Sequence, residues 1–554
     1  MIRSLLTNHD IWRAATLLLL SLVTISSLCA KKTRTRMIGR TLDVSFILTI
    51  GLALFCWRAP AIFLNTEINV DESQTLAQAI CFHHDATPWR SADATTSGPL
   101  NTYIYMWPYI INTQPTFITL RITSLILIWI TVTALFNVSK KLLDDQNAYI
   151  ALLPCLLYLL YTTGPDFMHA STEWLPVALT ACSFALSFKV WQGNARPIRC
   201  IIIGLLLGSV PLAKLQGVPT AGILGLALCA RIIYLRQKQW KSHTACLIAG
   251  ALFVPIIILL AVIKGGAFDE MWIRYFIQNF NYQGDFAQSS YLERLRLLLM
   301  NNGQIVTYLA WGIGTIITSL FLKFREVIKS KDQTTLAIAL LVWMTGTIFS
   351  IVKTGHNFPH YLTFLVFPTS ICAFFAMRAM GRDENRSVIS CTFIGMIGLL
   401  IQGWVTPNNL GAYTNATLSS SDFRDPVSRY VSEESSPGDT LGIWGWTPRY
   451  FAETQLRSAT RDMVSYFLIT EHPFQQHYRD TYLADLKRSS PRIFIDTATD
   501  FTESPKFLPL EQRRHTNFPA LRDYISENYD KVGEMTPQNF KTPFWIYVRK
   551  LGKN

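Results

Sequence analysis

Residues 42–72 read LDVSFILTIGLALFCWRAPAIFLNTEINVDE, a predominantly apolar run that ends in the acidic pair Asp71-Glu72. An α-helix needs about 20 mostly apolar residues to cross the roughly 30 Å hydrocarbon core of a bilayer. The run therefore predicts a membrane-spanning helix over 42–62. The acidic pair follows closely enough to lie at the membrane surface.

Similar apolar runs recur through the first 404 residues. The 554-residue chain is 50% hydrophobic and only 16% charged, with a mean hydropathy of +0.24. Positions 405–554 hold 18 basic and 18 acidic residues, so the net charge of +13 lies entirely in the first 404 positions. This composition indicates a polytopic α-helical membrane protein and excludes a disordered chain, a disulfide scaffold and a cytosolic enzyme. We predict about twelve spans, near 11–30, 42–62, 116–137, 148–162, 173–190, 199–213, 217–235, 244–263, 304–322, 334–352, 360–379 and 387–404.

Alternate loops between these spans differ sharply in basic residues. One set holds 21 Lys and Arg, whereas the other set holds 7 although it is longer in total. By the positive-inside rule the basic set, which includes 138–147 and 378–386, is cytoplasmic. The other set and the C-terminal region then face the periplasm, the cell exterior or a lumen. The first span could be a signal peptide, but its basic cluster follows the apolar run, so we expect a retained helix.

A change in composition divides the chain after residue 404. We predict a transmembrane domain, 1–404, with external loops 63–115 and 264–303, and a soluble extracytoplasmic domain, 405–554. Short amphipathic helices along the membrane surface are expected in the first loop. The C-terminal domain is predicted to have an α/β fold, with strands in 438–446, 490–498 and 542–550 and helices in 423–434 and 518–529.

Ionisable groups collect at the outer ends of the predicted spans. Placing a charge in or near hydrocarbon costs free energy, so such residues usually mark a functional site. The carboxylates there could act as a general base or bind a metal, and the cations suit a phosphate at headgroup depth. These residues are Asp71, Glu72, Asp166, Glu173, Lys214, Lys353, His169, His356 and His360, together with Gln216. Each also has a structural interpretation: the three acids Asp71, Glu72 and Glu173 could begin helices, Lys214 could extend to the headgroups, and the histidines could be satisfied interfacial groups.

An Asp-Glu pair in the first long external loop resembles the glycosyltransferase C superfamily, which includes bacterial aminoarabinose and arabinosyl transferases and protein O-mannosyltransferases. Further segments resemble this superfamily in the same order. They are SGPLNTYIY (97–105), LRITSLILIWITVTALFNVSKKL (120–142), HASTEWLPVAL (169–179), PLAKLQGVP (211–219), NFPHYLTFLVFP (357–368) and WGWTPRYFAETQLRSATRD (444–462). The resemblance covers most of the chain. One departure is an added first helix, which makes the second span the one that precedes the acidic loop.

The resemblance implies roles for particular residues. Asp71 would match the external-loop acid, proposed as the base for an acceptor hydroxyl or as a metal ligand. Glu72 would support it, and Glu173 would match the acid of the second external loop. The donor phosphate is assigned, on charge and depth, to Lys214, Gln216, Lys353, His356, His360 and Tyr361. Trp444, Trp446 and Tyr450 could bind an acceptor glycan, although a strand core explains these aromatics equally well.

The implied reaction is the transfer of a sugar, with inversion, from a polyprenyl-phosphate donor to a glycan, lipid or protein acceptor. Membrane lipids are expected partners, and nucleic acids are not. Asp71 and Glu173 could hold Mg²⁺ or Mn²⁺, but related transferases include metal-free examples. The expected location is the inner membrane of a bacterium, with the C-terminal domain in the periplasm or exterior. A transporter or lipid flippase and a polysaccharide polymerase or ligase remain alternatives, although no internal repeat and no arginine-rich external loop favours them.

Overall fold

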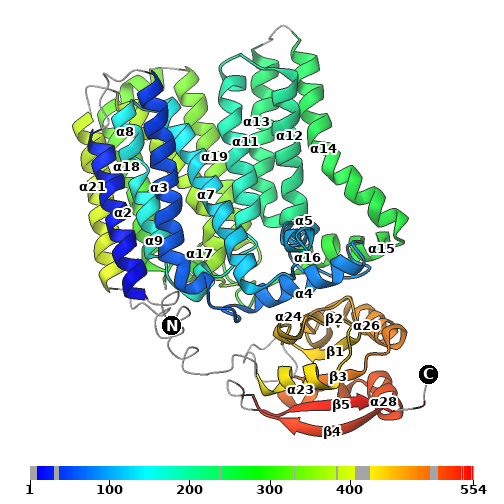
Figure 1. Cartoon of the computed structure of the whole chain (residues 1–554). Coiled ribbons are helices and arrows are strands. Elements are labelled where there is room, and N and C mark those ends of the chain that lie inside the picture. Colours follow the sequence, from blue (N-terminus) through cyan, green and yellow to red (C-terminus); the bar gives the residue numbers. More distant parts are fainter. Residues whose placement is uncertain are drawn as a thin grey trace. The chain divides into compact units, whose positions relative to one another are not determined.

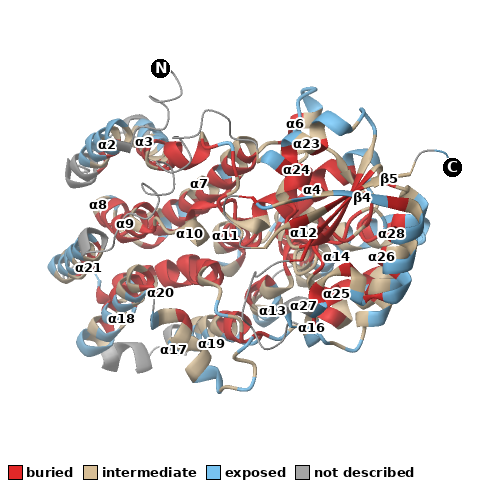
Figure 2. Ribbon diagram, turned by 90° about the horizontal axis from the view of Figure 1, so that it is seen from below, coloured by how far each residue is buried: buried red, intermediate tan, exposed pale blue. Residues whose placement is uncertain are grey.

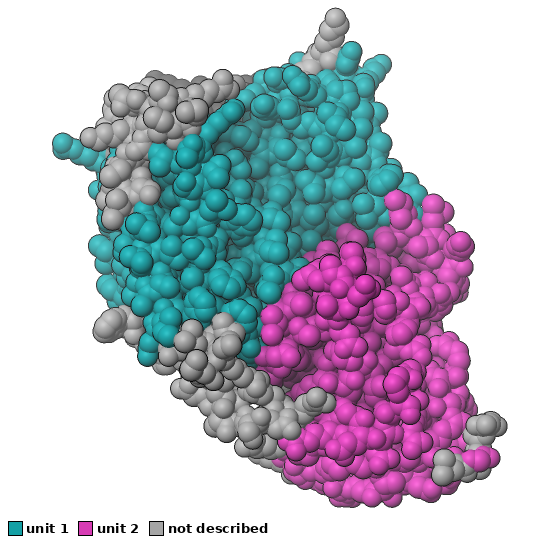
Figure 3. Space-filling view, viewed as in Figure 1, with its two compact units in different colours: residues 1–64, 121–256, 286–416 teal, residues 65–120, 257–285, 417–554 magenta. Residues whose placement is uncertain are grey.

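A computed structural model describes residues 9–29, 36–235, 239–300, 302–329, 331–381, 385–405, 425–498, 509–537, 540, 542–550 and 552. The chain forms two compact units, coloured separately in Figure 3. Unit 1 comprises Met1–Leu64, Arg121–Ile256 and Phe286–Ala416, and unit 2 comprises Asn65–Leu120, Ile257–Asp285 and Thr417–Asn554. Residues 65–115 of the first external loop and 264–285 of the second therefore group with the C-terminal region, whereas the prediction placed both loops in the domain 1–404. Segment 406–424, next to that boundary, lies outside the described residues.

Unit 1 is a bundle of helices (Figure 1), because its sequence consists of long apolar runs separated by short polar turns. Its elements, in whole or in part, are α2 (His9–Cys29), α3 (Arg36–Ile62), α7 (Phe117–Leu142), α8 (Asp145–Ile150), α9 (Leu153–Tyr161), α10 (Pro165–Met168), α11 (Trp174–Trp191), α12 (Pro197–Ala213), η1 (Leu215–Gly217), α13 (Val218–Tyr234), α14 (Trp240–Lys264), α17 (Tyr291–Met300), α18 (Gly303–Lys329), α19 (Lys331–Val352), η3 (Pro359–Leu365), α20 (Val366–Met380) and α21 (Asn385–Val405).

Every predicted span coincides with helical structure, but not every one is long enough to cross a membrane. Within the described residues, eight helices are long and apolar enough to do so, and Pro197–Ala213 and Arg386–Gln402 are shorter apolar helices. The predicted span 148–162 is divided between α8 and α9. Pro154, which lacks an N–H group, stands at the start of α9, where a proline is tolerated. The count of twelve spans is therefore not confirmed, whereas the multi-pass helical architecture is.

The first external loop forms α4 (Val70–His84), α5 (Pro99–Ile104) and α6 (Trp107–Ile110). The expectation of amphipathic helices lying on a membrane surface is wrong for α4, in which every residue from 72 to 82 is buried (Figure 2). Its apolar side chains Ala77, Cys81 and Phe82 join one hydrophobic core with Leu441 and Ile493 of the C-terminal region. The loop and the C-terminal region thus fold together, because each supplies part of the other's core.

The C-terminal region confirms the predicted α/β fold and each of its predicted strands and helices. Its sheet has the order β2-β1-β3-β5-β4, in which β1 pairs in parallel with β2 and β3, and β5 is antiparallel to β3 and β4. The elements are α23 (Pro426–Glu434), β1 (Thr440–Gly445), α24 (Arg449–Thr454), β2 (Arg457–Ser458), α25 (Tyr466–Ile469), α26 (Gln475–Ser489), β3 (Ile493–Thr497), α27 (Leu510–Arg513), η4 (His515–Asn517), α28 (Pro519–Asn528), β4 (Tyr529–Met535) and β5 (Phe544–Arg549).

A buried ion cluster joins the distant segments of unit 2. The second external loop forms α15 (Phe268–Glu270), the π-helix η2 (Met271–Ile277) and α16 (Gln278–Asn281). Arg274 on η2 is only 1% exposed and donates to Asp93 at 3.0 Å, to Asp462 at 2.6 Å and to Glu270 at 2.6 Å. Asp93 also accepts, through its backbone carbonyl, a bond from Gln78 of α4 at 3.3 Å. The cluster therefore links both external loops to the C-terminal region.

Replacing Arg274 by alanine is expected to lower the free energy of unfolding of unit 2 by about 3–5 kcal/mol, because the buried carboxylates of Asp93 and Asp462 and the partly buried Glu270 lose their shared cation. The measurement is thermal unfolding of the purified protein, combined with limited proteolysis of the C-terminal region. Arg522→Ala is the matched control, since Arg522 forms an exposed pair with Asp523 at 2.9 Å and such pairs contribute about 0–1 kcal/mol. Equal effects of the two substitutions would contradict the proposed structural role of the cluster.

The same cluster predicts a pH dependence. Burial raises the pKa of Asp462 from 3.8 to about 6, although Arg274 beside it acts in the opposite direction. A carboxyl whose pKa is raised on folding contributes stability that is fully present below its unfolded pKa and is lost as the pH rises through its folded pKa. We expect the unfolding temperature to fall between pH 4 and 6 more steeply in the wild type than in Asp462→Asn. Parallel profiles for the two proteins would show that Asp462 does not titrate in this range.

Candidate functional site

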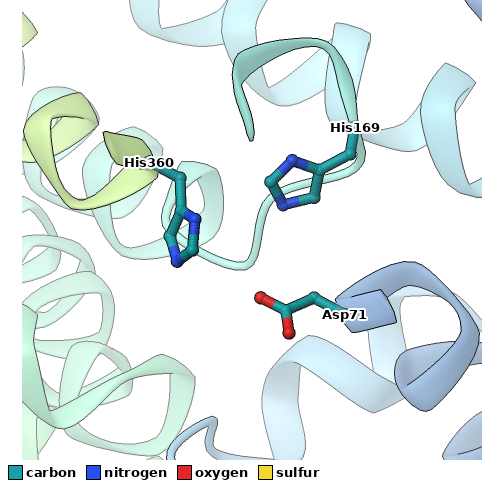
Figure 4. Close-up of side chains that lie close together, drawn as sticks. All are labelled: Asp71, His169 and His360. Carbon is teal, nitrogen blue, oxygen red and sulfur yellow. The ribbon is translucent and has the colours of Figure 1, made fainter. Parts of the chain in front are cut away.

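The acidic pair stands in the first turn of α4. Asn69 caps the helix by accepting a bond from the Asp71 N–H group at 3.0 Å. The Glu72 carboxylate is fully buried and turns back to accept a bond from the Ile68 N–H group at 3.1 Å. Asp71 is partly exposed, and its side chain extends from the start of the helix (Figure 4). Asp71 therefore keeps a partly exposed carboxylate, whereas Glu72 stabilises the helix start, as one interpretation of the sequence proposed.

In unit 1 the key feature is a break between two apolar helices. Helix α12 ends at Ala213, Lys214 takes an extended conformation with φ −163° and ψ 129°, and the turn η1 leads into α13. Gly217 lets this turn pack closely, because a Cβ atom there would lie 2.7 Å from Val210 Cγ1 and force one of the two residues to shift. Non-helical backbone at this depth is tolerated where it is buried in protein. The break presents the Lys214 side chain at the end of an otherwise apolar segment.

Lys214 forms a buried ion pair with Glu173, which directly precedes α11. The lysine side chain is 3% exposed and the glutamate side chain 0%, and Lys214 Nζ donates to Glu173 Oε1. Lys214 Nζ also donates to Thr172 Oγ1 at 2.8 Å, and Ser171 Oγ donates to Glu173 Oε2. A buried pair of this kind needs such additional hydrogen bonds to offset its desolvation. Sequence reasoning gave Glu173 and Lys214 separate roles, as a catalytic acid and as a phosphate ligand. In the structure the two side chains are bonded to each other.

Histidines and a second acid surround this pair. His360 Nε2 lies 3.9 Å from Glu173 Oε1, and His360 Nδ1 lies 3.6 Å from Asp166 Oδ1. The imidazoles of His169 and His360 meet edge to face, with centroids 5.6 Å apart (Figure 4). Burial raises the pKa of Asp166, but His360 and His169 outweigh this effect, so that its pKa lies below the ordinary value. The Asp166 side chain is 37% exposed, so the buried pair borders an accessible carboxylate.

The other predicted donor residues divide into near and distant groups. Tyr361 is near, because Lys214 Nζ lies 5.4 Å from the centre of its ring. His356 stacks on Phe358 with centroids 4.9 Å apart, and Phe358 stacks on His360 at 5.5 Å. Lys353 is an exposed residue just beyond α19. Tyr361 and the histidines therefore share one region of unit 1 with Lys214.

Two buried polar atoms of this region have no hydrogen-bond partner among the described residues. They are His169 Nε2 and Gln216 Oε1. Buried polar atoms in folded proteins are almost always bonded, and exceptions are explained by a water, an ion or a functional role. The buried ammonium group and the neighbouring imidazole suit an anionic ligand, whereas the Gln216 oxygen accepts hydrogen bonds and suits a hydroxyl group or a water. Glu173 fits a metal poorly, because a cation there would have to displace Lys214.

The proposed acceptor aromatics lie mostly in the core of unit 2. Trp444 is 1% exposed and donates through its indole N–H group to the Arg513 carbonyl at 2.7 Å, and Tyr450 is fully buried. A buried ring cannot stack on a sugar, so the alternative of a strand core accounts for both residues. Trp446 is only partly buried and packs edge-on against Tyr466 at 5.2 Å.

Sequence analysis overlooked Arg58. This residue lies inside the apolar run 42–62, is 5% exposed, and donates to the Phe167 carbonyl at 3.2 Å. The signal was an arginine within a predicted span, which is rare enough to mark a functional or packing role. Arg121, also inside a predicted span, donates to the Ala61 carbonyl at 2.7 Å and to the Leu64 carbonyl, and so caps the end of α3.

Comparisons with known proteins support the fold. No family model matches the chain, and no curated protein matches it. A crystal structure of ArnT from Cupriavidus metallidurans bound to undecaprenyl phosphate matches 94% of this chain and 99% of its own, with 11% identity and a TM-score of 0.56. The oligosaccharyltransferase AglB from Archaeoglobus fulgidus, in complex with an inhibitory peptide and a dolichol-phosphate, matches 92% of this chain and 74% of its own, with 12% identity and a TM-score of only 0.44. The likeness to ArnT shows that the chain shares the fold of that protein, in agreement with the fold expected from the resemblance.

Proposed function

We propose that this protein is an integral-membrane glycosyltransferase that transfers a sugar, with inversion, from a polyprenyl-phosphate donor to an acceptor on the outer face of the membrane. The observation that carries the proposal is the buried Lys214–Glu173 pair at the helix break, beside the imidazole of His360. The ArnT-like fold and the partly exposed Asp71 carboxylate support it. The acceptor is a lipid, a glycan or a protein, and the membrane is the inner membrane of a bacterium.

In the proposed reaction Asp71 acts as the general base. Its carboxylate takes the proton of an acceptor hydroxyl, and the hydroxyl oxygen attacks the anomeric carbon of the donor sugar. The bond between that carbon and the phosphate oxygen breaks as the new bond forms on the opposite face. The polyprenyl phosphate leaves with the electron pair, and the configuration is inverted because the reaction has a single displacement.

Lys214 is proposed to stabilise the leaving phosphate. Negative charge develops on the phosphate as the sugar departs, and a preorganised cation in a water-poor site stabilises that charge more than bulk water can. Glu173 would hold the ammonium group in position before the donor binds, and His360 lies beside both partners. Glu173 is therefore a positioning residue, rather than the free acid that the resemblance implied.

The proposed mechanism contains no step that requires a divalent cation. The candidate ligand pair Asp71 and Glu173 fits Mg²⁺ or Mn²⁺ poorly, because both Glu173 oxygens already accept hydrogen bonds from Lys214, Ser171 and Thr172. Chelation with EDTA, followed by addition of Mg²⁺ or Mn²⁺, tests this point. Activity that is lost and then restored would assign a metal to the reaction.

The deciding experiment uses the purified protein in liposomes with a panel of polyprenyl-phosphate sugars. We expect release of free polyprenyl phosphate, detected by mass spectrometry, together with a glycosylated acceptor extracted from membranes. Donor that crosses the bilayer intact would instead establish a flippase. Consumption of a diphosphate-linked oligosaccharide, but not of a monophosphate sugar, would establish a polymerase or ligase.

A further inference from the structure

Unit 1 contains a large apolar cavity that the proposed function does not use. Its volume is about 1130 Å³, above the roughly 300–1,000 Å³ of typical small-molecule pockets. It is lined by α18, α19 and α20, which pack together on one side of the bundle (Figure 2), and by the ends of α7 and α17. Its polar lining residues are only Lys141, Asp144, Asn147, Ser319, Thr369 and Arg378. The size and the lining suit hydrocarbon chains rather than a polar solute.

One end of this cavity is basic. Arg378 Nη1 donates to the Leu142 carbonyl at 2.8 Å, which places the guanidinium group at the end of α7, the helix that also carries Lys141. Lys141 Nζ donates to the Ala185 carbonyl at 2.5 Å. Neither cation forms an ion pair with a carboxylate in the part of the chain that the structure describes. The neighbouring Lys140, by contrast, pairs with Asp145 at 2.5 Å and with Asp43 at 3.2 Å.

The acid at this end is already engaged. Asp144 caps α8 by accepting from the Asn147 N–H group at 3.0 Å, and it also accepts from the Asn147 side chain at 3.0 Å. Its charge therefore serves the start of a helix, where a carboxylate is favoured. Lys141 and Arg378 are left as the two cations in the lining of an apolar cavity.

We propose that this cavity is a binding site for an anionic glycerophospholipid, whose acyl chains fill the apolar part and whose phosphate lies between Lys141 and Arg378. Two features on which the proposal rests are independent: the volume and lining of the cavity, and the absence of acid partners for its cations among the described residues. Basic pockets between membrane helices on the cytoplasmic side bind anionic headgroups in this way. Lys141 and Arg378 lie in the last turns of α7 and α20, within the segments 138–147 and 378–386 that the charge pattern places on the cytoplasmic side.

The donor lipid is a different ligand, because its phosphate is assigned to Lys214 on the outer side. The lipid site therefore does not depend on the proposed transfer reaction. A resident phospholipid of the inner leaflet would fill the space between α18, α19 and α20, and so stabilise their packing.

Native mass spectrometry of the delipidated protein tests the proposal with palmitoyl-oleoyl phosphatidylglycerol and with the zwitterionic phosphatidylcholine of the same chains. We expect the wild type to prefer phosphatidylglycerol by about tenfold or more, because its headgroup has a net negative charge, whereas the choline cation of phosphatidylcholine is repelled by Lys141 and Arg378. The double variant K141Q/R378Q should lose this preference. The matched control K140Q should keep it, since Lys140 is already paired with acids.

A second variant tests the apolar part of the cavity independently of its two cations. Ile316 lines the cavity and is only partly buried, so Ile316→Trp can fill the space without disrupting the core. It should weaken binding of both phospholipids several-fold. Equal affinity of the wild type for the two lipids would overturn the proposal. A second result would also overturn it: undecaprenyl phosphate displaces phosphatidylglycerol from the wild type, and Ile316→Trp prevents undecaprenyl phosphate from binding. The cavity would then bind the polyprenyl tail of the donor.

Discussion

Asp71→Asn is expected to lower kcat by about 10²- to 10⁴-fold, the usual contribution of a general base, and to leave donor affinity nearly unchanged. Asparagine has nearly the same shape as aspartate, but its amide group cannot take up the proton of the acceptor hydroxyl. The helix start should survive, because Asn69 and Glu72 bond to backbone N–H groups that the substitution does not touch. The measurements are the rate of polyprenyl-phosphate release and the binding of donor to the purified variant.

A matched control for this prediction lies in the same unit. Asp85 forms an ion pair with Arg90 at 2.7 Å and is likewise partly exposed. Asp85→Asn removes the same charge from unit 2 and should leave kcat within about twofold of wild type. If Asp71→Asn retains full activity, or if both variants lose activity equally, Asp71 is not the base.

Lys214→Met should abolish detectable donor binding and lower the free energy of unfolding of unit 1 by about 3–5 kcal/mol, because Glu173 is left charged and buried without its cation. Both effects follow from the same pair, but they can be separated. In the double variant E173Q/K214M neither partner carries a charge, and most of the stability should return. Donor binding should not return, because the ammonium group is still absent.

Thermal unfolding in detergent and binding of polyprenyl phosphate measure these two effects. Lys140→Met serves as the control, since Lys140 is a paired lysine in a different part of unit 1. Recovery of donor binding in E173Q/K214M would remove Lys214 from the phosphate site and leave the pair a purely structural role.

Much of the fold could be predicted from local sequence. Membrane-spanning helices follow from the length of apolar runs, and the strands of the C-terminal region follow from short alternating or apolar segments between turns. The exceptions have local causes that the hydropathy pattern did not reveal. Residues 148–162 are apolar throughout, but a proline at the start of α9 divides them into two short helices.

The candidate site was predicted by composition and not by geometry. Sequence order indicated that Asp71, Glu173, Lys214 and His360 are unusual residues near one membrane surface. It did not indicate that Glu173 and Lys214 bond to each other across 41 positions, or that Glu72 faces the backbone. An ion pair between distant positions depends on how helices pack, and no local pattern of residues encodes that packing.

The sequence by itself determined a multi-pass helical protein with an α/β region at its C-terminal end, because the free energy of burying an apolar run depends mainly on its own length and composition. Only the tertiary structure decided which segments fold as one unit. Arg274 joins carboxylates at positions 93, 270 and 462, so its buried charge is compensated only after both external loops and the C-terminal region have come together.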